Sequence, residues 1–274
     1  MLEGPAQVID HTATAKVFPV IRADEAESVF VYEDTASSRA GIVTMTKKLE
    51  RGRIAIVGLG GTGSYVLDHL AKTPVAEIHL FDGDKFLQHN AFRSPGAPSA
   101  EDLERDLKKV EWFAEVYSRI RRRVVPHAVD LNESNTGELQ GMDFVFLCID
   151  KGSPKRQVVD FLLQNNIPFI DAGMGMHVEG ESLAGLVRVT TAVPGESGNV
   201  IGRIPFADGA NEEYAQNIQV SDLNALNAAL AVIRWKKLWG FYSDSEGELS
   251  TTYMVSTNAL INEVTSNEIQ TNSS

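Results

Sequence analysis

Polar side chains that could handle phosphate occupy three separate stretches of this chain. Asp82 and Asp84 follow one apolar run, Asn90 and Arg93 come shortly after them, and Asp150 ends a later apolar run. An arginine can clamp phosphate through its planar guanidinium group, and a carboxylate can hold Mg²⁺ against phosphates. Because hydride transfer from a dinucleotide does not need this set, the set favours chemistry on a triphosphate.

A glycine cluster precedes these residues, in the segment RIAIVGLGGTGS that spans 53–64. An apolar β-rich run leads into the cluster, and an amphipathic run over 64–72 follows it. This order of strand, glycine turn and helix start is typical of a nucleotide-binding βαβ unit. The helix N-terminus would then face a phosphate and favour its negative charge. The cluster consists of Gly58, Gly60, Gly61 and Gly63.

Asp82 lies about 20 residues after the glycine turn, where a carboxylate can accept both hydroxyls of a nucleotide ribose. The glycine turn and Asp82 alone fit an NAD-binding site equally well. Asp150 ends the fourth predicted strand, at the same carboxyl edge of the sheet as Asp82, and is therefore a candidate Mg²⁺ ligand.

Apolar runs alternate with helical patterns, which predicts an α/β fold with right-handed parallel crossovers. We expect a Rossmann-like, mostly parallel sheet flanked by helices, extended by C-terminal antiparallel strands and a crossover loop. The predicted strands are 54–57, 75–81, 124–131, 144–149, 167–171, 183–193 and 251–261. The predicted helices are 39–51, 64–72, 100–123, 153–165 and 222–240, with a turn at 173–176 and a long loop at 194–217.

The predicted organisation has three parts. Residues 1–38 form an N-terminal extension, which could be the remnant of a preceding domain in a longer polypeptide. Residues 39–262 form the α/β domain, and residues 263–274 form a flexible tail.

The composition restricts the partners. Acidic residues outnumber basic ones by 37 to 25, which gives a net charge of −12 and disfavours a nucleic-acid partner. The apolar runs are too short to cross a bilayer and no secretion signal is evident, so we expect a cytoplasmic protein with no membrane partner. Cys148 is the single cysteine, which excludes a Cys-x-x-Cys zinc site. Its apolar surroundings predict a core residue rather than a catalytic thiol.

The combination of these motifs resembles the ThiF/MoeB/HesA adenylyltransferases, relatives of the ubiquitin-activating enzymes. The resemblance makes 39–262 an adenylation domain, and the late segment NALNAAL from 224 to 230 also matches the family. The segment HNAFRSPGA over 89–97 is similar to the corresponding segment of a bacterial subgroup whose members are encoded near ubiquitin-like modification genes. The motifs that carry the resemblance are the glycine turn, Asp82-x-Asp84, Asn90-x-x-Arg93, a helix lysine and Asp150.

The resemblance implies a reaction. ATP would bind at the glycine turn, and the C-terminal carboxylate of a small ubiquitin-like protein would attack the α-phosphate. The products would be an acyl-adenylate and pyrophosphate, as the activating step of a conjugation or sulfur-transfer pathway. The implied cofactors are ATP and Mg²⁺ with no zinc, and the implied partners are the modifier, a conjugating-enzyme-like acceptor and a second copy of the chain.

The resemblance also assigns residues to the nucleotide. Asp82 would hold the ribose, and Asn90 would contact phosphates. Asp84 and His89 would lie beside the nucleotide, together with the four glycines of the turn.

The implied catalytic residues are Arg93, Lys109, Asp150 and Arg39. Arg93 would contact phosphates, Lys109 would neutralise developing charge, with Lys108 as the alternative, and Asp150 would bind Mg²⁺. Arg39 resembles the arginine that reaches into a partner subunit's site, although its spacing is shorter than expected. No general base is needed, because the attacking carboxylate is already ionised; catalysis would be positioning and charge neutralisation.

The chain departs from the family in its cysteines. It lacks the zinc-binding cysteine pairs, and Cys148 matches a strand position rather than the transfer cysteine of the conjugating branch. The chain would therefore hand over the adenylate, or a hydroxyl of Thr190, Thr191 or Ser197 would accept the acyl group. A hydroxyl needs a base to become a good nucleophile, and His177 is the nearest histidine in the sequence.

Two other functions compete with adenylation. A nicotinamide-dependent oxidoreductase could use the same glycine turn, but we see no hydride-handling set of His, Lys and Tyr. A catalytically silent nucleotide-binding subunit of a heterodimeric activator is the second, and the intact Asp82, Arg93 and Asp150 argue against it.

Overall fold

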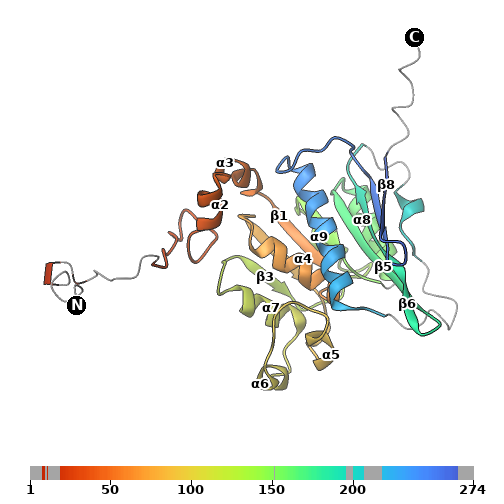
Figure 1. The fold of residues 1–274 in the computed structure, drawn as a ribbon, viewed down its shortest axis with the longest axis horizontal. Helices are drawn as coiled ribbons and strands as arrows, with labels where there is room; N and C mark the ends of the chain where they lie inside the picture. Colours follow the sequence, from red (N-terminus) through yellow and green to blue (C-terminus); the bar gives the residue numbers. More distant parts are fainter. Residues whose placement is uncertain are drawn as a thin grey trace, which may run out of the picture.

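The structure of the chain is a computed structural model that describes residues 8, 9, 11, 19–150, 152–195, 200–206 and 218–264. These residues build one eight-stranded sheet with the strand order β3-β2-β1-β4-β5-β6-β7-β8. Helices cover both faces of the sheet (Figure 1). None of the helices in this described part of the chain combines the length and apolarity that a bilayer crossing needs.

The sheet is parallel from β3 to β5 and antiparallel from β5 to β8. The predicted fold class, a Rossmann-like sheet extended by C-terminal antiparallel strands, is therefore confirmed. The predicted crossover loop lies largely outside the described residues. The strands are β1 Arg53–Val57, β2 Glu77–Phe81, β3 Val124–His127, β4 Phe144–Leu147, β5 Phe169–Glu179, β6 Ser182–Ala192, β7 Ser250–Met254 and β8 Ala259–Glu263.

Two layers of helices flank the sheet. On one face α4, α7 and α9 pack against β1, β2 and β4, and on the other face α8 and η2 pack against β1, β4 and β5. The α-helices are α2 Thr35–Ala40, α3 Val43–Thr46, α4 Gly61–Ala71, α5 Gln88–Ala91, α6 Ala100–Glu104, α7 Lys109–Tyr117, α8 Gly152–Gln164 and α9 Ser221–Leu238. The 3₁₀ helices are η1 Lys47–Leu49, η2 Thr136–Leu139 and η3 Ile201–Arg203.

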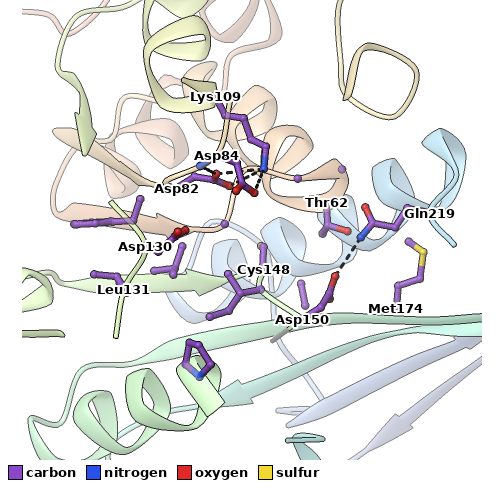
Figure 2. Close-up of a pocket in the computed structure, with 18 of the residues that line it drawn as sticks. Thr62, Asp82, Asp84, Lys109, Asp130, Leu131, Cys148, Asp150, Met174 and Gln219 are labelled. Atoms are coloured by element: carbon purple, nitrogen blue, oxygen red, sulfur yellow. Dashed lines mark hydrogen bonds and ion pairs between the residues drawn. The ribbon is translucent and has the colours of Figure 1, made fainter. Parts of the chain in front are cut away.

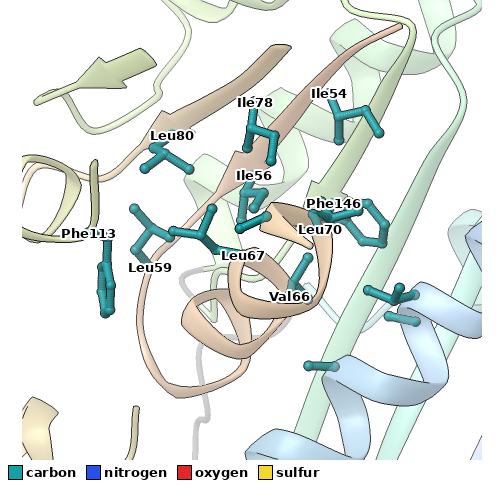
Figure 3. Close-up of a cluster of buried hydrophobic side chains, with 14 of the residues drawn as sticks. Ile54, Ile56, Leu59, Val66, Leu67, Leu70, Ile78, Leu80, Phe113 and Phe146 are labelled. Carbon is teal, nitrogen blue, oxygen red and sulfur yellow. The ribbon is translucent and has the colours of Figure 1, made fainter. Parts of the chain in front are cut away.

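The core explains why β1 has a continuous apolar sequence. Ile54 and Ile56 point toward α4, and Ala55 and Val57 point toward α8, because successive side chains of a strand face opposite sides. Figure 3 shows Ile54 and Ile56 beside Val66, Leu67 and Leu70 of α4. Full burial of each large aliphatic side chain contributes about 1.5–3 kcal/mol, so this layer holds the glycine turn between β1 and α4 in place.

A buried ionic cluster joins α8 to the sheet. Asp171 of β5 is fully buried, and its Oδ1 lies 2.6 Å from Lys155 Nζ on α8. Arg188 of β6 approaches the other carboxylate oxygen at 3.6 Å. Burial raises the pKa of the Asp171 carboxyl, and the two cations oppose that shift. The cluster therefore fixes α8 against the first residues of β5 and the neighbouring end of β4.

A histidine pair joins β2 to the edge strand β3. His79 Nδ1 lies 3.0 Å from His127 Nε2, and His79 Nε2 lies 3.1 Å from Glu77 Oε2. The His127 ring stacks on Phe81, with the ring centroids 4.3 Å apart. Desolvation and the neighbouring His79 lower the pKa of His127, while Glu138 on η2 opposes this shift. The fold therefore favours a neutral His127 beneath the carboxyl end of β2.

The predicted single helix over 100–123 is wrong. The chain forms α6 and α7 with a break between them, where Asp106 has a left-handed φ of 55°. Lys108 pairs with Lys85 in an isolated antiparallel bridge, which takes it out of any helix. This non-local pairing overrides the helical pattern and makes Lys109 the first residue of α7.

Two further predictions need correction. The expected turn at 173–176 lies inside β5, because its glycines and methionines pair with Leu186, Gly185 and their neighbours on β6. The expected strand over 251–261 is the β7–β8 hairpin, in which Asn258 has a left-handed φ of 53°.

The later part of the predicted N-terminal extension packs on the main domain. Phe30 is buried, the Val31 amide donates to the Ile120 carbonyl at 2.9 Å, and the Arg122 amide donates to the Val29 carbonyl at 2.6 Å. This segment therefore belongs to the same folded unit as β3. Residues 12–18 of the predicted extension lie outside the described residues.

Replacing Lys155 with Met should destabilise the protein by about 3 kcal/mol, because it leaves the buried Asp171 carboxylate without its nearest cation. Urea unfolding would measure the change. The control is Arg156→Met on the same helix, whose exposed pair with Asp160 should be worth about 0.5 kcal/mol or less. Equal losses in the two variants would contradict a stabilising role for the buried cluster.

Acidification should weaken the fold through His127. Because the pKa of His127 is lowered in the fold, the unfolded chain binds a proton more readily below about pH 6.5, and stability falls there as pH decreases. We expect His127→Gln, which keeps a donor toward His79, to show a shallower decline in unfolding free energy between pH 7.5 and 5. The exposed His89→Gln is the control and should keep the wild-type slope. An unchanged slope in His127→Gln would disprove the assignment.

Candidate functional site

A cavity of about 250 Å³ opens at the carboxyl ends of β1, β2 and β4, beside the segment that follows β3 (Figure 2). This edge is where open α/β sheets bind ligands. Its polar lining consists of Gly58, Gly60, Gly61, Thr62, Asp82, Asp84, Arg93, Lys109, Asp130, Asp150 and Gln219. Eight of the residues predicted from the sequence therefore lie around one cavity: Gly58, Gly60, Gly61, Asp82, Asp84, Arg93, Lys109 and Asp150.

The glycine turn has both packing and ligand-facing positions. Gly58 has a φ of 89°, and a Cβ there would lie 2.6 Å from the Cys148 carbonyl oxygen. A Cβ on Gly63 would lie 1.9 Å from the Gly58 carbonyl oxygen, so Gly63 serves the packing of α4 rather than the cavity. A Cβ on Gly60 would have no neighbouring atom within 4 Å. Gly60, at the N-terminus of the 11-residue α4, therefore leaves room for a ligand group such as phosphate.

Asp82 joins the end of β2 to the glycine turn. Its carboxylate accepts hydrogen bonds from the Leu59 amide at 2.7 Å and from the Asp84 amide at 2.9 Å. Lys109 Nζ lies 3.2 Å from Asp82 Oδ1 and 2.8 Å from Asp84 Oδ2. Asp82 and Lys109 are both buried, whereas the Asp84 side chain is 62% exposed. The site thus holds one cation between a fixed and an exposed carboxylate.

The break before α7 determines which lysine faces the cavity. The Lys109 amide donates to the Asp84 carbonyl at 3.0 Å, and the Phe86 amide donates to the Leu107 carbonyl at 2.9 Å. These bonds bring the start of α7 beside the loop after β2. Lys109 lines the cavity, while the ammonium group of Lys108 donates to the Gly83 carbonyl.

Asn90 lies in α5 and Arg93 follows that helix, but only Arg93 lines the cavity. Within the described residues, Arg93 Nε and Asn90 Nδ2 are buried without a hydrogen-bond partner. Asn90 Oδ1 accepts from the Leu87 amide at 2.9 Å, which shapes the loop that carries Arg93. His89 is an exposed residue of α5 and Arg39 an exposed residue of α2; neither lines the cavity.

Asp150 lies at the opposite end of the cavity from Asp82 (Figure 2). Its Oδ2 accepts a hydrogen bond from Gln219 Nε2 at 3.2 Å. Among the described residues, no three His, Cys, Asp or Glu side chains are grouped so as to hold a metal ion. One carboxylate beside an open cavity nevertheless fits Mg²⁺, which is commonly held by one or two carboxylates together with substrate phosphates and water.

Asn224 of α9 is a site residue that the sequence motifs do not single out. It is fully buried, and its Oδ1 accepts from Thr62 Oγ1 at 3.0 Å while its Nδ2 donates to the Arg93 carbonyl at 3.4 Å. A Cβ on Gly61 would lie 2.0 Å from Asn224 Nδ2. Asn224 therefore connects the glycine turn to the arginine loop. The sequence does contain an indication of its role, because Asn224 is the first residue of the NALNAAL segment that resembles the family.

Asp130 and Gln219 also line the cavity without having been predicted. Asp130 was concealed by the expectation that the third strand runs to residue 131, whereas β3 ends at His127. Its Oδ1 accepts from the Gly83 amide at 3.1 Å. Gln219 lies in the short gap between the predicted loop at 194–217 and the predicted helix at 222–240.

Comparison with known proteins identifies the family of the chain. The ThiF family model matches residues 34–266. Ubiquitin-like modifier-activating enzyme 5 of Drosophila mojavensis is 27% identical over 154 residues, covering 51% of this chain and 38% of that protein. The tRNA threonylcarbamoyladenosine dehydratase of Escherichia coli K12 is 30% identical over 127 residues, covering 44% of this chain and 45% of that protein. The chain thus spans less than half the length of these relatives.

Among solved structures, E. coli MccB with AMPCPP and selenomethionine MccA superimposes with a TM-score of 0.65. The two sequences are 20% identical, and the match covers 85% of this chain and 72% of that chain. A likeness at this identity shows a shared fold. Together with the family match over most of its length, it means that this chain belongs to the ThiF family, as its glycine turn and neighbouring polar residues predicted.

Proposed function

We propose that this chain uses Mg-ATP to adenylate the C-terminal carboxylate of a small ubiquitin-like protein, as the activating step of a bacterial ubiquitin-like conjugation or sulfur-transfer pathway. The observation that carries the proposal is that Asp82, Arg93, Lys109 and Asp150 meet in one cavity beside the glycine turn. Family membership and the modifier-activating enzyme among the relatives support it. The solved MccB structure with AMPCPP supports a nucleotide in this fold.

The reaction follows from the positions of these groups. A carboxylate oxygen of the modifier attacks the α-phosphorus, a new P–O bond forms, and the bond to the β-phosphate oxygen breaks to release pyrophosphate. Asp82 would hold the ribose, while Gly60 and the α4 N-terminus accommodate the phosphates. Lys109 touches Asp82, so it lies close to where the α-phosphate joins the ribose. Arg93 and Lys109 would then neutralise the charge of the transition state.

The metal would be held by Asp150. When bound, Mg²⁺ withdraws charge from the phosphate oxygens and so makes pyrophosphate a better leaving group. Gln219 donates to Asp150 Oδ2 and thereby orients the carboxylate. Asp150 offers an oxygen ligand, and the neighbouring Cys148 thiol stays protonated because desolvation raises its pKa, which suits Mg²⁺ rather than zinc.

The single cysteine of the sequence determines whether the adenylate can be converted to a thioester on this chain. Desolvation raises the pKa of the Cys148 thiol, so it is a poor nucleophile. Thr190 and Thr191 are buried in β6, which disfavours both as acyl acceptors, and Ser197 lies outside the described residues. Handover of the adenylate to a conjugating-enzyme-like acceptor therefore fits this chain best.

The wider proposal includes a homodimer in the cytoplasm, with 1–38 as an extension, 39–262 as the adenylation domain and 263–274 as a tail. In that dimer Arg39 would reach into the site of the second copy, which is compatible with its exposure on α2 and its distance from the lining of its own cavity. A nicotinamide-dependent oxidoreductase would have no use for Arg93 and Asp150, and a silent subunit would not need to keep them.

ATP–pyrophosphate exchange tests the reaction. We expect exchange that requires Mg²⁺ and a ubiquitin-like protein encoded beside this chain's gene, with its native C-terminus. Asp150→Ala should lower the exchange rate by about 10²-fold or more, because it removes the proposed metal ligand. Its melting temperature should stay near the wild-type value, since Asp150 is exposed.

The matched control is Asp160→Ala, which removes an exposed aspartate of α8 that does not line the cavity. This variant should retain wild-type exchange. Full exchange in Asp150→Ala would reject the metal role. Tight NAD binding without any exchange would favour the oxidoreductase.

A second prediction separates the two roles of glycine in the turn. Gly60→Ala should keep the wild-type stability but weaken Mg-ATP binding about tenfold, because its Cβ enters the space left for phosphate. Gly63→Ala should lower stability, because its Cβ would overlap the Gly58 carbonyl oxygen. Thermal unfolding and titration calorimetry would measure both. Unchanged ATP affinity in Gly60→Ala would place the phosphates elsewhere.

A further inference from the structure

The first turn of α9 contacts the elements that form the cavity, although none of the residues of this fully described helix lines it. We propose that Asn224 is a positioning residue for adenylation: it holds the backbone of Arg93 at a fixed place relative to the glycine turn and so aims the guanidinium at the phosphates. This inference rests on the proposed ATP-dependent function and adds a residue that serves the reaction without touching the nucleotide.

The orientation of the Asn224 amide follows from its two partners. The Arg93 carbonyl can only accept a hydrogen bond, so the amide atom that lies 3.4 Å from it is Nδ2. Oδ1 then faces Thr62, whose hydroxyl donates to it at 3.0 Å. Asn224 is fully buried, so bulk water cannot replace either partner. Since an unpaired buried polar group is costly, the fold favours a geometry in which both bonds form together.

The helix α4 fixes this part of α9. Tyr65 Oη lies 2.6 Å from Ser221 Oγ, three residues before Asn224. A Cβ on Gly61 would lie 2.0 Å from Asn224 Nδ2, so the asparagine side chain requires the bare glycine backbone beside it. Asn224 is therefore held against the same N-terminus of α4 that would face the phosphates.

The loop that carries Arg93 needs an attachment of this kind. The Arg93 amide donates to the Asn90 carbonyl at 3.1 Å, and Ser94 Oγ donates to the same carbonyl at 2.7 Å. These bonds shape the loop but do not join it to the glycine turn. Within the described residues, Arg93 Nε is buried without a hydrogen-bond partner. The bond from Asn224 thus connects the Arg93 backbone to α9 and, through Thr62, to α4.

The approach to α9 contacts the metal end of the cavity as well. Gln219, two residues before the helix begins, donates from Nε2 to Asp150 Oδ2 at 3.2 Å (Figure 2). One helix start therefore contacts the proposed metal ligand and, through Asn224, the proposed phosphate-binding arginine. The charges that these two residues bring must act together on the phosphates in the transition state. Their relative position should consequently affect the rate more than the affinity for ATP.

A double-mutant cycle on ATP–pyrophosphate exchange tests this inference. Asn224→Ala should lower kcat about tenfold or more while changing the Kd for Mg-ATP, measured by calorimetry, less than about threefold. In an Arg93→Ala background the same change should alter kcat less than about twofold, because its effect acts through that arginine. Asn224→Leu, which fills a similar volume without hydrogen bonds, should lower kcat as Asn224→Ala does and leave no cavity in the core.

Asn227→Ala is the matched control. Asn227 is also fully buried on α9, but it donates to the Gly173 carbonyl at 3.0 Å rather than to the arginine loop. This variant should lower the melting temperature about as much as Asn224→Ala and keep the wild-type kcat.

Two results would overturn the positioning role while leaving the adenylation activity of the wild type intact. One is an equal loss of kcat in Asn224→Ala and Asn227→Ala. The other is a double variant in which the effects of Asn224→Ala and Arg93→Ala multiply, because independent contributions behave in that way. Absence of exchange in the wild type would instead refute the proposed function, and this inference with it.

Discussion

The carboxylate of Asp82 lies where the cavity's principal elements meet, and the geometry of the site depends on its hydrogen bonds. One oxygen accepts the Leu59 amide in the glycine turn, and the other accepts the Asp84 amide and lies near Lys109 at the start of α7. The strand β2, the turn after β1 and the helix α7 are therefore tied to one buried group. Without Asp82, the Lys109 ammonium would be buried beside a turn that no longer had its acceptor, at a cost of several kcal/mol.

The parts of this arrangement that follow from local sequence could be predicted. β1 and β4 have continuous apolar sequences because both of their faces are buried, and the polar residues that follow them must lie at one edge of a parallel sheet. Asp82 and Asp150 were identified on this basis. The glycine turn could be predicted for a similar reason. A Cβ at Gly58 or Gly63 would collide with neighbouring backbone, so the fold requires glycine at both positions and the sequence shows it.

The parts that depend on pairing between distant residues could not be predicted. The bridge between Lys85 and Lys108 breaks a segment with a good helical pattern, and it places Lys109, the lysine that the family resemblance already favoured, in the cavity. The glycines at 173 and 175 suggested a turn, although pairing with β6 makes them part of a long strand. Asp130 was hidden in the same way, because the apolar pattern continues past the end of β3. The local pattern of apolar and polar residues carries no information about pairing with residues that are distant in the sequence.

The position of Lys109 between two carboxylates connects the fold to the proposed reaction. A buried cation needs a partner in the free protein, and Asp82 and Asp84 supply it. Asp82 is also held by Leu59, so its place is fixed, whereas Asp84 is exposed and can be rehydrated at little cost. An incoming α-phosphate could therefore take the place of Asp84 beside the Lys109 ammonium, while Asp82 keeps the lysine aimed at the junction of ribose and phosphate. The Lys109 ammonium would then face the phosphate after exchanging only its exposed partner, Asp84.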